Sequence, residues 1–217
     1  MNFAAARFNM VECQIRTNRV SDPRVLAALK DVPREVFVSK PMRSFAYVDE
    51  DLDVGGGRFV IEPLVLARLL EAAEIKPSDV VLNIGDATGY STAVLSRLAQ
   101  TVVALESDPD WVVRSSQSLT ALNIDNAAVV GGALLAGCPA QAPFNVIVLS
   151  GAVDSIPQDL RRQLADGGRL VGVVGSGTCL GKAVLVVRVG DTWGQRNLFD
   201  ASTAALPVPK GKPTFVF

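Results

Sequence analysis

The residues best placed to bind a small molecule form a glycine-containing turn followed by an acidic residue. The turn is Asn83-Ile84-Gly85-Asp86-Ala87-Thr88-Gly89-Tyr90. Glycine in such a turn lets the backbone approach a ligand with no side chain between them. Glu106 lies 106 − 85 = 21 residues after Gly85, and a ribose-binding acid is expected about 20 residues after the turn. The pair indicates a nucleotide-like ligand whose ribose hydroxyls donate hydrogen bonds to a carboxylate.

The spacing of small residues within the turn separates two classes of cofactor. A dinucleotide-binding G-x-G-x-x-G turn would require small residues at positions 85, 87 and 90. Position 90 is tyrosine, and the small residues stand at 85, 87 and 89, as G-x-A-x-G. This pattern resembles the G-x-G-x-G turn that binds S-adenosylmethionine, with one glycine replaced by alanine. The alternative is an incidental glycine turn in a flavodoxin-like or NAD-type sheet.

Short apolar runs that alternate with amphipathic segments place this turn in an α/β frame. We expect strands at 80–85, 101–106, 127–132, 144–150, 169–175, 183–189 and 214–217, and helices at 64–74, 89–100, 109–122 and 157–165. This alternation predicts βαβ units and a mostly parallel sheet with helices on both faces. No strong helix separates the last two strands, which favours an antiparallel edge.

The first 60 residues follow a different pattern. Apolar residues recur at helical spacing near the start, and Asp22-Pro23 predicts the beginning of a second helix. Residues 47–60 are acidic and then glycine-rich, which predicts an extended loop with a bend at 55–57.

The chain length favours a single domain. Within 1–217 we expect a helical and loop extension at 1–60, a nucleotide-fold core at 61–176 and C-terminal strands at 177–217.

Composition excludes several classes of function. The chain has 217 residues, 21 basic and 22 acidic, and a formal net charge of −1. This balance argues against a nucleic-acid partner, which requires concentrated positive charge. The chain contains no histidine, so Ser-His and Cys-His catalysis are excluded and no metal is expected. Three separated cysteines, with no signal peptide or membrane-spanning run, predict a cytoplasmic protein with reduced thiols and no membrane partner.

Segments along much of the chain resemble the protein-L-isoaspartate O-methyltransferase family. They are Asp22-Pro23-Arg24-Val25-Leu26, Val32-Pro33-Arg34-Glu35-Val36-Phe37, Ala46-Tyr47, 57–63, 81–90, 143–148, Ile156-Pro157 and 167–171. The resemblance covers residues 10–176 and implies an α/β, Rossmann-like class I S-adenosylmethionine-dependent methyltransferase fold. Such a fold has a mostly parallel seven-stranded sheet, here with an N-terminal helical addition over the substrate cleft. The implied function is protein repair, by methyl transfer to a damaged aspartyl carboxylate.

The resemblance also indicates which loop of the protein faces the methyl acceptor. The family's T-I-S-x-P loop is Phe59-Val60-Ile61-Glu62-Pro63 here, so Ile61 stands at the position of the serine. Glu62 in the cleft would repel a substrate carboxylate, whereas Arg58 would pair with it. Alternatively, Glu62 caps the following helix and Ile61 belongs to the core. The catalytic residue stays unassigned, with Arg58 and Glu62 as candidates.

The predicted S-adenosylmethionine site combines the glycine turn with the ends of the next two strands. Its candidate residues are Asn83, Gly85, Asp86, Ala87, Thr88, Gly89, Tyr90, Glu106, Ser107, Gly132 and Ala133. Compared with the family, Asn83 replaces the acid that opens the glycine motif. Gly131-Gly132-Ala133 replaces Gly-Asp-Gly, whose acid contacts adenine.

Three functions are compatible with this sequence. The first is an S-adenosylmethionine-dependent O-methyltransferase that acts on a protein or peptide carboxylate. The second is a methyltransferase with a small-molecule acceptor. The third is a catalytically inactive relative that serves as a binding or regulatory module, with weak or no S-adenosylmethionine binding. The composition is compatible with a monomer or a dimer.

Overall fold

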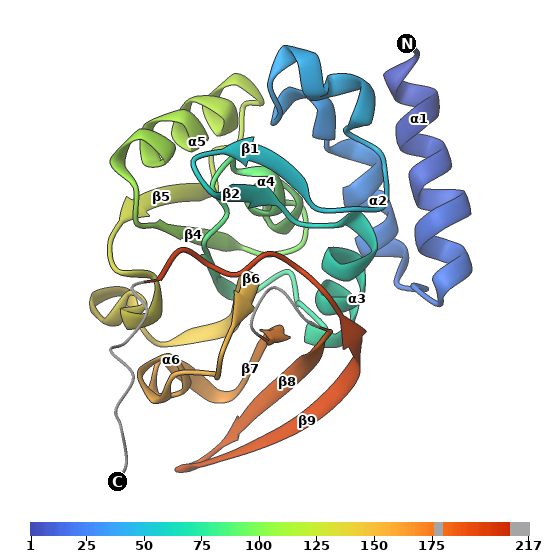
Figure 1. Cartoon of the computed structure of the whole chain (residues 1–217). Helices are drawn as coiled ribbons and strands as arrows, with labels where there is room; N and C mark the ends of the chain where they lie inside the picture. Colours follow the sequence, from blue (N-terminus) through green and yellow to red (C-terminus); the bar gives the residue numbers. More distant parts are fainter. Residues whose placement is uncertain (176–179, 209–217) are drawn as a thin grey trace, which may run out of the picture.

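The computed structural model describes residues 1–175 and 180–208 (Figure 1). Within these residues the main sheet has seven strands in the order β5-β4-β3-β6-β7-β8-β9, and β1 and β2 form a separate hairpin. The strands are β1 (Leu52–Gly55), β2 (Arg58–Val60), β3 (Val80–Ile84), β4 (Thr101–Glu106), β5 (Ala127–Gly131), β6 (Phe144–Val153), β7 (Leu164–Val174), β8 (Gly181–Val189) and β9 (Thr192–Ala201). Strands β3 to β7 are parallel, and β8 and β9 form an antiparallel edge. The predicted mostly parallel sheet is therefore confirmed.

Helices cover both faces of this sheet. The α-helices are α1 (Phe3–Asn9), α2 (Pro23–Asp31), α3 (Pro63–Ala73), α4 (Tyr90–Ser96), α5 (Pro109–Ala121) and α6 (Gln158–Arg162). Helical segments of the π or 3-10 type are η1 (Met10–Ile15), η2 (Arg16–Asn18), η3 (Arg34–Val36), η4 (Lys40–Phe45), η5 (Leu134–Ala136) and η6 (Pro139–Gln141). No helix in the described part of the chain has the length and apolar character needed to cross a bilayer.

Strand alternation divides the apolar residues between two cores. Val81, Val102 and Val146 join the core that also contains α2, α3 and α4. Leu82 and Ile147, one position further along β3 and β6, face the opposite core with α6. Successive strand residues point to opposite faces, so short apolar runs produce a sheet buried on both sides. The carboxyl ends of the parallel strands lie together at one edge of this sheet.

The N-terminal extension packs against the first core face. Asp22 caps α2, and its carboxylate accepts a hydrogen bond from the Arg24 backbone NH at 2.8 Å, as Asp22-Pro23 predicts. The π-helical turn η1 continues α1 and buries Met10, Val11 and Ile15. These contacts fix α1 and η1 beside α2 and α3 (Figure 1).

Two expectations about local structure differ from what is observed. Residues 47–60 do not form only a loop, because β1 and β2 pair as a hairpin whose bend at 55–57 has positive φ at each glycine. Strand β9 was not expected, because most of its side chains are exposed and show no apolar alternation. The predicted strand at 214–217 lies outside the described residues.

The segment that follows β9 returns across the carboxyl edge of the main sheet. We call residues 203–208 the return segment. Ala205 pairs with Ala152 as a parallel bridge. Ala152 NH donates to the Ala204 carbonyl, and Leu206 NH donates to the Ala152 carbonyl, both at 2.8 Å. Figure 1 shows this part of the chain, in red, crossing near the end of β6.

Candidate functional site

The glycine turn lies where the strand order reverses. Strand β3 pairs with β4 on one side and with β6 on the other. In open α/β sheets a ligand binds in the crevice outside the strand ends at such a switch point. Gly85 follows β3 with φ +80°, and Gly89 precedes α4 with φ +92°, a region that only glycine adopts readily. We call the space above Gly85 the switch-point crevice.

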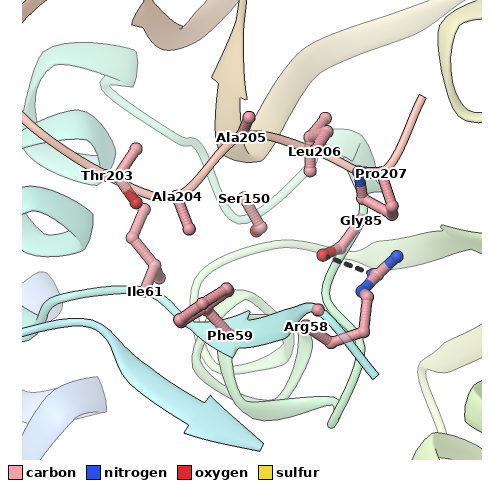
Figure 2. A pocket seen from close by; sticks show the side chains of 11 residues that line it. Arg58, Phe59, Ile61, Gly85, Ser150, Thr203, Ala204, Ala205, Leu206 and Pro207 are labelled. Atoms are coloured by element: carbon pink, nitrogen blue, oxygen red, sulfur yellow. Dashed lines mark hydrogen bonds between the residues drawn. The ribbon is translucent and has the colours of Figure 1, made fainter. Parts of the chain in front are cut away.

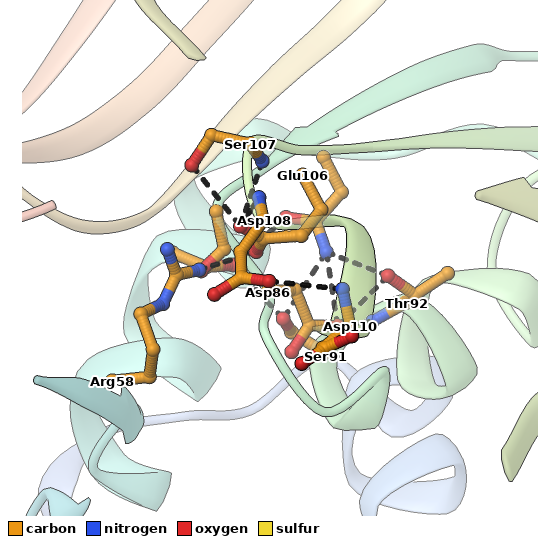
Figure 3. Close-up of polar contacts among 11 residues, drawn as sticks. Arg58, Asp86, Ser91, Thr92, Glu106, Ser107, Asp108 and Asp110 are labelled. Carbon is orange, nitrogen blue, oxygen red and sulfur yellow. Dashed lines mark hydrogen bonds and ion pairs between the residues drawn. The ribbon is translucent and has the colours of Figure 1, made fainter. Parts of the chain in front are cut away.

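Glu106 lies beside this crevice at the end of β4, where the spacing predicts it. Its carboxylate accepts hydrogen bonds from the backbone NH groups of Ser107 (2.7 Å) and Asp108 (3.1 Å). The other carboxylate oxygen forms an ion pair with Arg58 from β2 (Figure 3). Arg58 Nη2 also donates to the Gly85 carbonyl at 3.1 Å (Figure 2). Both charged side chains are almost completely buried. Arg58 therefore uses part of the acceptor capacity of the second carboxylate oxygen.

The polar residues at the start of the turn bind one another. Asn83 Nδ2 donates to Thr92 Oγ1 at 2.9 Å and to Ser91 Oγ at 3.1 Å. Asp86 Oδ2 accepts from the Thr92 backbone NH at 2.7 Å (Figure 3). Ser150 in β6 donates to Asn83 Oδ1 at 2.8 Å. This network joins the turn to the first residues of α4. The roles of Asn83 and Asp86 in binding a ligand stay predictions.

Three other turn residues face away from the switch-point crevice or lie under it. Tyr90 is fully buried, with its ring 5.6 Å from that of Phe37 and 4.6 Å from the Arg34 guanidinium. Ala87 is also fully buried. Thr88 lines a different cavity of about 210 Å³. In this conformation Tyr90 and Ala87 have no surface that a ligand could touch.

Leu206 of the return segment fills the switch-point crevice. A Cβ added at Gly151 would lie 2.7 Å from Leu206 Cδ2, and one added at Gly85 would be closer still. The remaining cavity of about 10 Å³ has Arg58 and Ile61 on one side and the return segment on the other (Figure 2). That volume holds about one water molecule. The residue types suit a nucleoside, but this conformation leaves no room for one above Gly85.

A larger cavity opens beyond the return segment. It measures about 450 Å³ and is lined by Ser107, Gly132, Ala133, Pro207 and Val208, among others. Such a volume is typical of a small-molecule pocket. The structure thus brings the predicted residues after β4 and β5 to one open cavity, next to Glu106.

The acceptor-side candidates lie where β2 leads into α3. Ile61 is buried in the core, as the alternative interpretation predicts, although it also lines the small cavity. Glu62 precedes α3, but its side chain makes no capping hydrogen bond. Burial, followed by the carboxylates of Asp49, Asp51 and Glu50, raises the pKa of Glu62 to about 7. Glu62 lines a separate cavity with Leu64 and Arg68, whereas Ile61 lines the small cavity at Gly85.

Asp51 was missed by the sequence analysis and connects three elements. One carboxylate oxygen accepts from the Glu62 backbone NH at 2.7 Å. The other accepts from Thr203 Oγ1 at 2.8 Å and from the Ala204 backbone NH at 2.6 Å. Leu206 was missed as well, since no local pattern shows that a segment after the last strand returns to the first glycine turn.

The chain has extensive similarity to known proteins. A family model described as protein-L-isoaspartate(D-aspartate) O-methyltransferase (PCMT) matches residues 6–197. The protein-L-isoaspartate O-methyltransferase of Methanoculleus marisnigri is 41% identical over 85% of this chain and 84% of that protein. Protein-L-isoaspartate O-methyltransferase 2 of Pelobacter propionicus is 39% identical over 84% of this chain and 81% of that protein.

Solved structures show the same fold. A protein-L-isoaspartate O-methyltransferase structure aligns with a TM-score of 0.80 and 25% identity, covering 92% of this chain and 65% of that longer chain. The Plasmodium falciparum beta-aspartate methyltransferase (PCMT) in complex with S-adenosyl-L-homocysteine has a TM-score of 0.74 and 18% identity. The alignment covers 95% of this chain and 98% of that chain. The second of these supports the fold alone.

Proposed function

Because the chain belongs to the protein-L-isoaspartate(D-aspartate) O-methyltransferase family, we propose that it methylates the free carboxylate of isoaspartyl residues in proteins or peptides. S-adenosylmethionine, the cofactor this family implies, would supply the methyl group. The observation that carries the proposal is the position of Glu106 beside Gly85 at the switch point of the sheet.

The proposed donor side uses groups at the ends of β3, β4 and β5. Glu106 would accept hydrogen bonds from ribose hydroxyls, because its carboxylate is already oriented by the Ser107 and Asp108 backbone NH groups. The cavity lined by Ser107, Gly132 and Ala133 would take the base. Neither role requires a histidine or a metal ion.

The proposed acceptor side lies at the end of β2. A carboxylate is already a nucleophile, so the protein has to orient it and exclude water. Arg58 Nη1 is buried without a hydrogen-bond partner among the described residues. A cationic NH in that state is suited to a substrate carboxylate. Arg58 would therefore hold the acceptor, and Ile61 beside it would keep water out.

A methyl-transfer assay tests this proposal. The purified chain is incubated with radiolabelled S-adenosylmethionine and an isoaspartyl peptide, with the same peptide containing ordinary aspartate as the control. We expect a base-labile methyl ester on the isoaspartyl peptide only. Equal labelling of both peptides, or labelling of neither, would reject the isoaspartyl acceptor.

One observation favours a second function. Leu206 packs on Gly85 and Arg58 pairs with Glu106, so both side chains stand where the proposed ligand would contact these residues. If S-adenosylmethionine neither binds nor is consumed, the chain is better described as a binding or regulatory module. Titration calorimetry with S-adenosylhomocysteine distinguishes this function from a methyltransferase with another acceptor, which would still bind the cofactor product.

A further inference from the structure

The return segment is attached to the protein at two places on either side of the crevice. Asp51 holds Thr203 and Ala204 through its carboxylate. Ala152 at the end of β6 holds the segment through a pair of backbone hydrogen bonds. The segment is thus fixed in register, and the next side chain along it, Leu206, is directed at Gly85.

The Leu206 side chain packs closely on Gly85 and Gly151, where a ligand in the switch-point crevice would lie. It is 5% exposed and belongs to the second hydrophobic core. Its terminal methyl group lies against the backbone of both Gly85 and Gly151. Gly85 directly follows β3, and Gly151 lies within β6, the strand paired with β3 at the switch point. These glycines have no side chains and so leave space above the backbone. In this structure Leu206 fills that space.

We propose that the return segment competes with the methyl donor for the switch-point crevice, so that the donor binds only when Leu206 leaves Gly85. This inference rests on the proposed function for its ligand. When the competent conformation is a minor fraction of the molecules, the measured affinity falls by that fraction. Leu206 is therefore an affinity-determining residue for the donor, although it would make no favourable contact with it.

Calorimetric titration with S-adenosylhomocysteine compares wild type with Leu206→Ala. The smaller side chain loses the apolar contacts that favour the closed state, so the variant should bind about tenfold more tightly, or more. Leu198→Ala is the matched control, because it removes the same atoms from a partly buried position on β9. The control should bind as wild type does. Equal affinity of Leu206→Ala and wild type would overturn the proposal, and so would the absence of binding by both.

Hydrogen exchange on the wild-type protein provides a test that needs no variant. The Ala204 NH donates to Asp51, and the Leu206 NH donates to Ala152. Saturating S-adenosylhomocysteine should accelerate exchange of these two amides, whereas a bound ligand usually slows exchange around its site. Slower exchange at both amides would show that the segment closes over the ligand and would contradict the competition.

The two proposals fail in different ways. If exchange accelerates and Leu206→Ala binds more tightly, but isoaspartyl peptide is not methylated, the competition holds and the proposed acceptor is wrong. If isoaspartyl peptide is methylated while Leu206→Ala and wild type bind equally, the proposed function holds and the competition is wrong.

Discussion

Arg58 and Glu106 form the most deeply buried ion pair near the candidate site, with 4% and 1% of their side chains exposed. Removing two charges from water is costly, and their attraction offsets the cost only when further hydrogen bonds are made. Glu106 gains two backbone NH donors and Arg58 gains the Gly85 carbonyl. The pair therefore stabilises the loop geometry around the crevice in addition to any role in binding.

Substitution of Glu106 separates these structural and binding roles. Glu106→Gln leaves the Arg58 guanidinium buried without its counter-charge, so the free energy of unfolding should fall by about 3 kcal/mol in urea titrations. The double variant Arg58→Met with Glu106→Gln removes the buried charge and should recover most of that stability. It should still bind S-adenosylhomocysteine poorly, because the charged carboxylate that would accept from the ribose hydroxyls becomes an amide with a single acceptor oxygen. Tight binding by the double variant would show that Glu106 is only structural.

Glu62 predicts a pH dependence of stability. Its pKa of about 7 in the folded protein exceeds the ordinary value of 4.5, so the folded state binds more protons than the unfolded state between these values. The folded state favours the neutral form of Glu62. The stability that this preference contributes is fully present below pH 4.5 and is lost as the pH rises through about 7. Glu62→Gln should raise the unfolding free energy by about 1–2 kcal/mol at pH 8 and hardly at all at pH 4, after allowance for partial exposure.

The control for this measurement lies at the opposite end of α3. Glu74 is exposed and follows the last turn of the helix. Urea titrations of Glu74→Gln should match wild type at both pH values. A Glu62→Gln gain that is the same at pH 4 and pH 8 would mean that titration of Glu62 is not its cause.

At the scale of elements, the hairpin, α3 and the return segment meet at Asp51. One carboxylate accepts hydrogen bonds from the Glu62 NH, the Thr203 hydroxyl and the Ala204 NH. Together these bonds set the position of β2 relative to the carboxyl ends of β3 and β6. The crevice therefore has walls contributed by three separate parts of the chain.

Replacement of Asp51 tests this arrangement. Asp51→Ala leaves three donors without their acceptor and should lower the unfolding free energy by about 2–3 kcal/mol. Asp53→Ala is the control, since Asp53 is exposed and accepts one bond, from the Gly55 NH at 2.7 Å. Chemical denaturation gives the unfolding free energy of each variant for comparison with wild type. Similar losses for the two would mean that Asp51 does not hold the elements together.

The sequence predicts the central elements better than the edges. Strands β3, β4 and β6 are predominantly apolar because both their faces are buried, and this pattern is visible without a structure. Strand β9 lies at the exposed edge and is held by backbone pairing to β8. Its side chains therefore show no apolar alternation from which a strand could be predicted. The hairpin of β1 and β2 was missed for a related reason, since its strands are short.

At the scale of the whole molecule, the sheet topology determines where the candidate site lies. The 21-residue separation of Gly85 and Glu106 predicts their proximity, because a βαβ unit brings the ends of adjacent strands together. Asp51 and Thr203 are separated by 152 residues, and no local pattern specifies their contact. The fold and the donor-side turn were therefore predictable, whereas the segment that fills the crevice was not.

A crystal structure of the chain with S-adenosylhomocysteine would show whether the ligand takes the place of Leu206 beside Gly85 and Glu106. We predict ribose hydroxyls within hydrogen-bond distance of Glu106, the base in the cavity lined by Ser107 and Ala133, and the Leu206 side chain displaced from Gly85. A structure with the ligand bound elsewhere, and with Leu206 still packed on Gly85, would contradict the account.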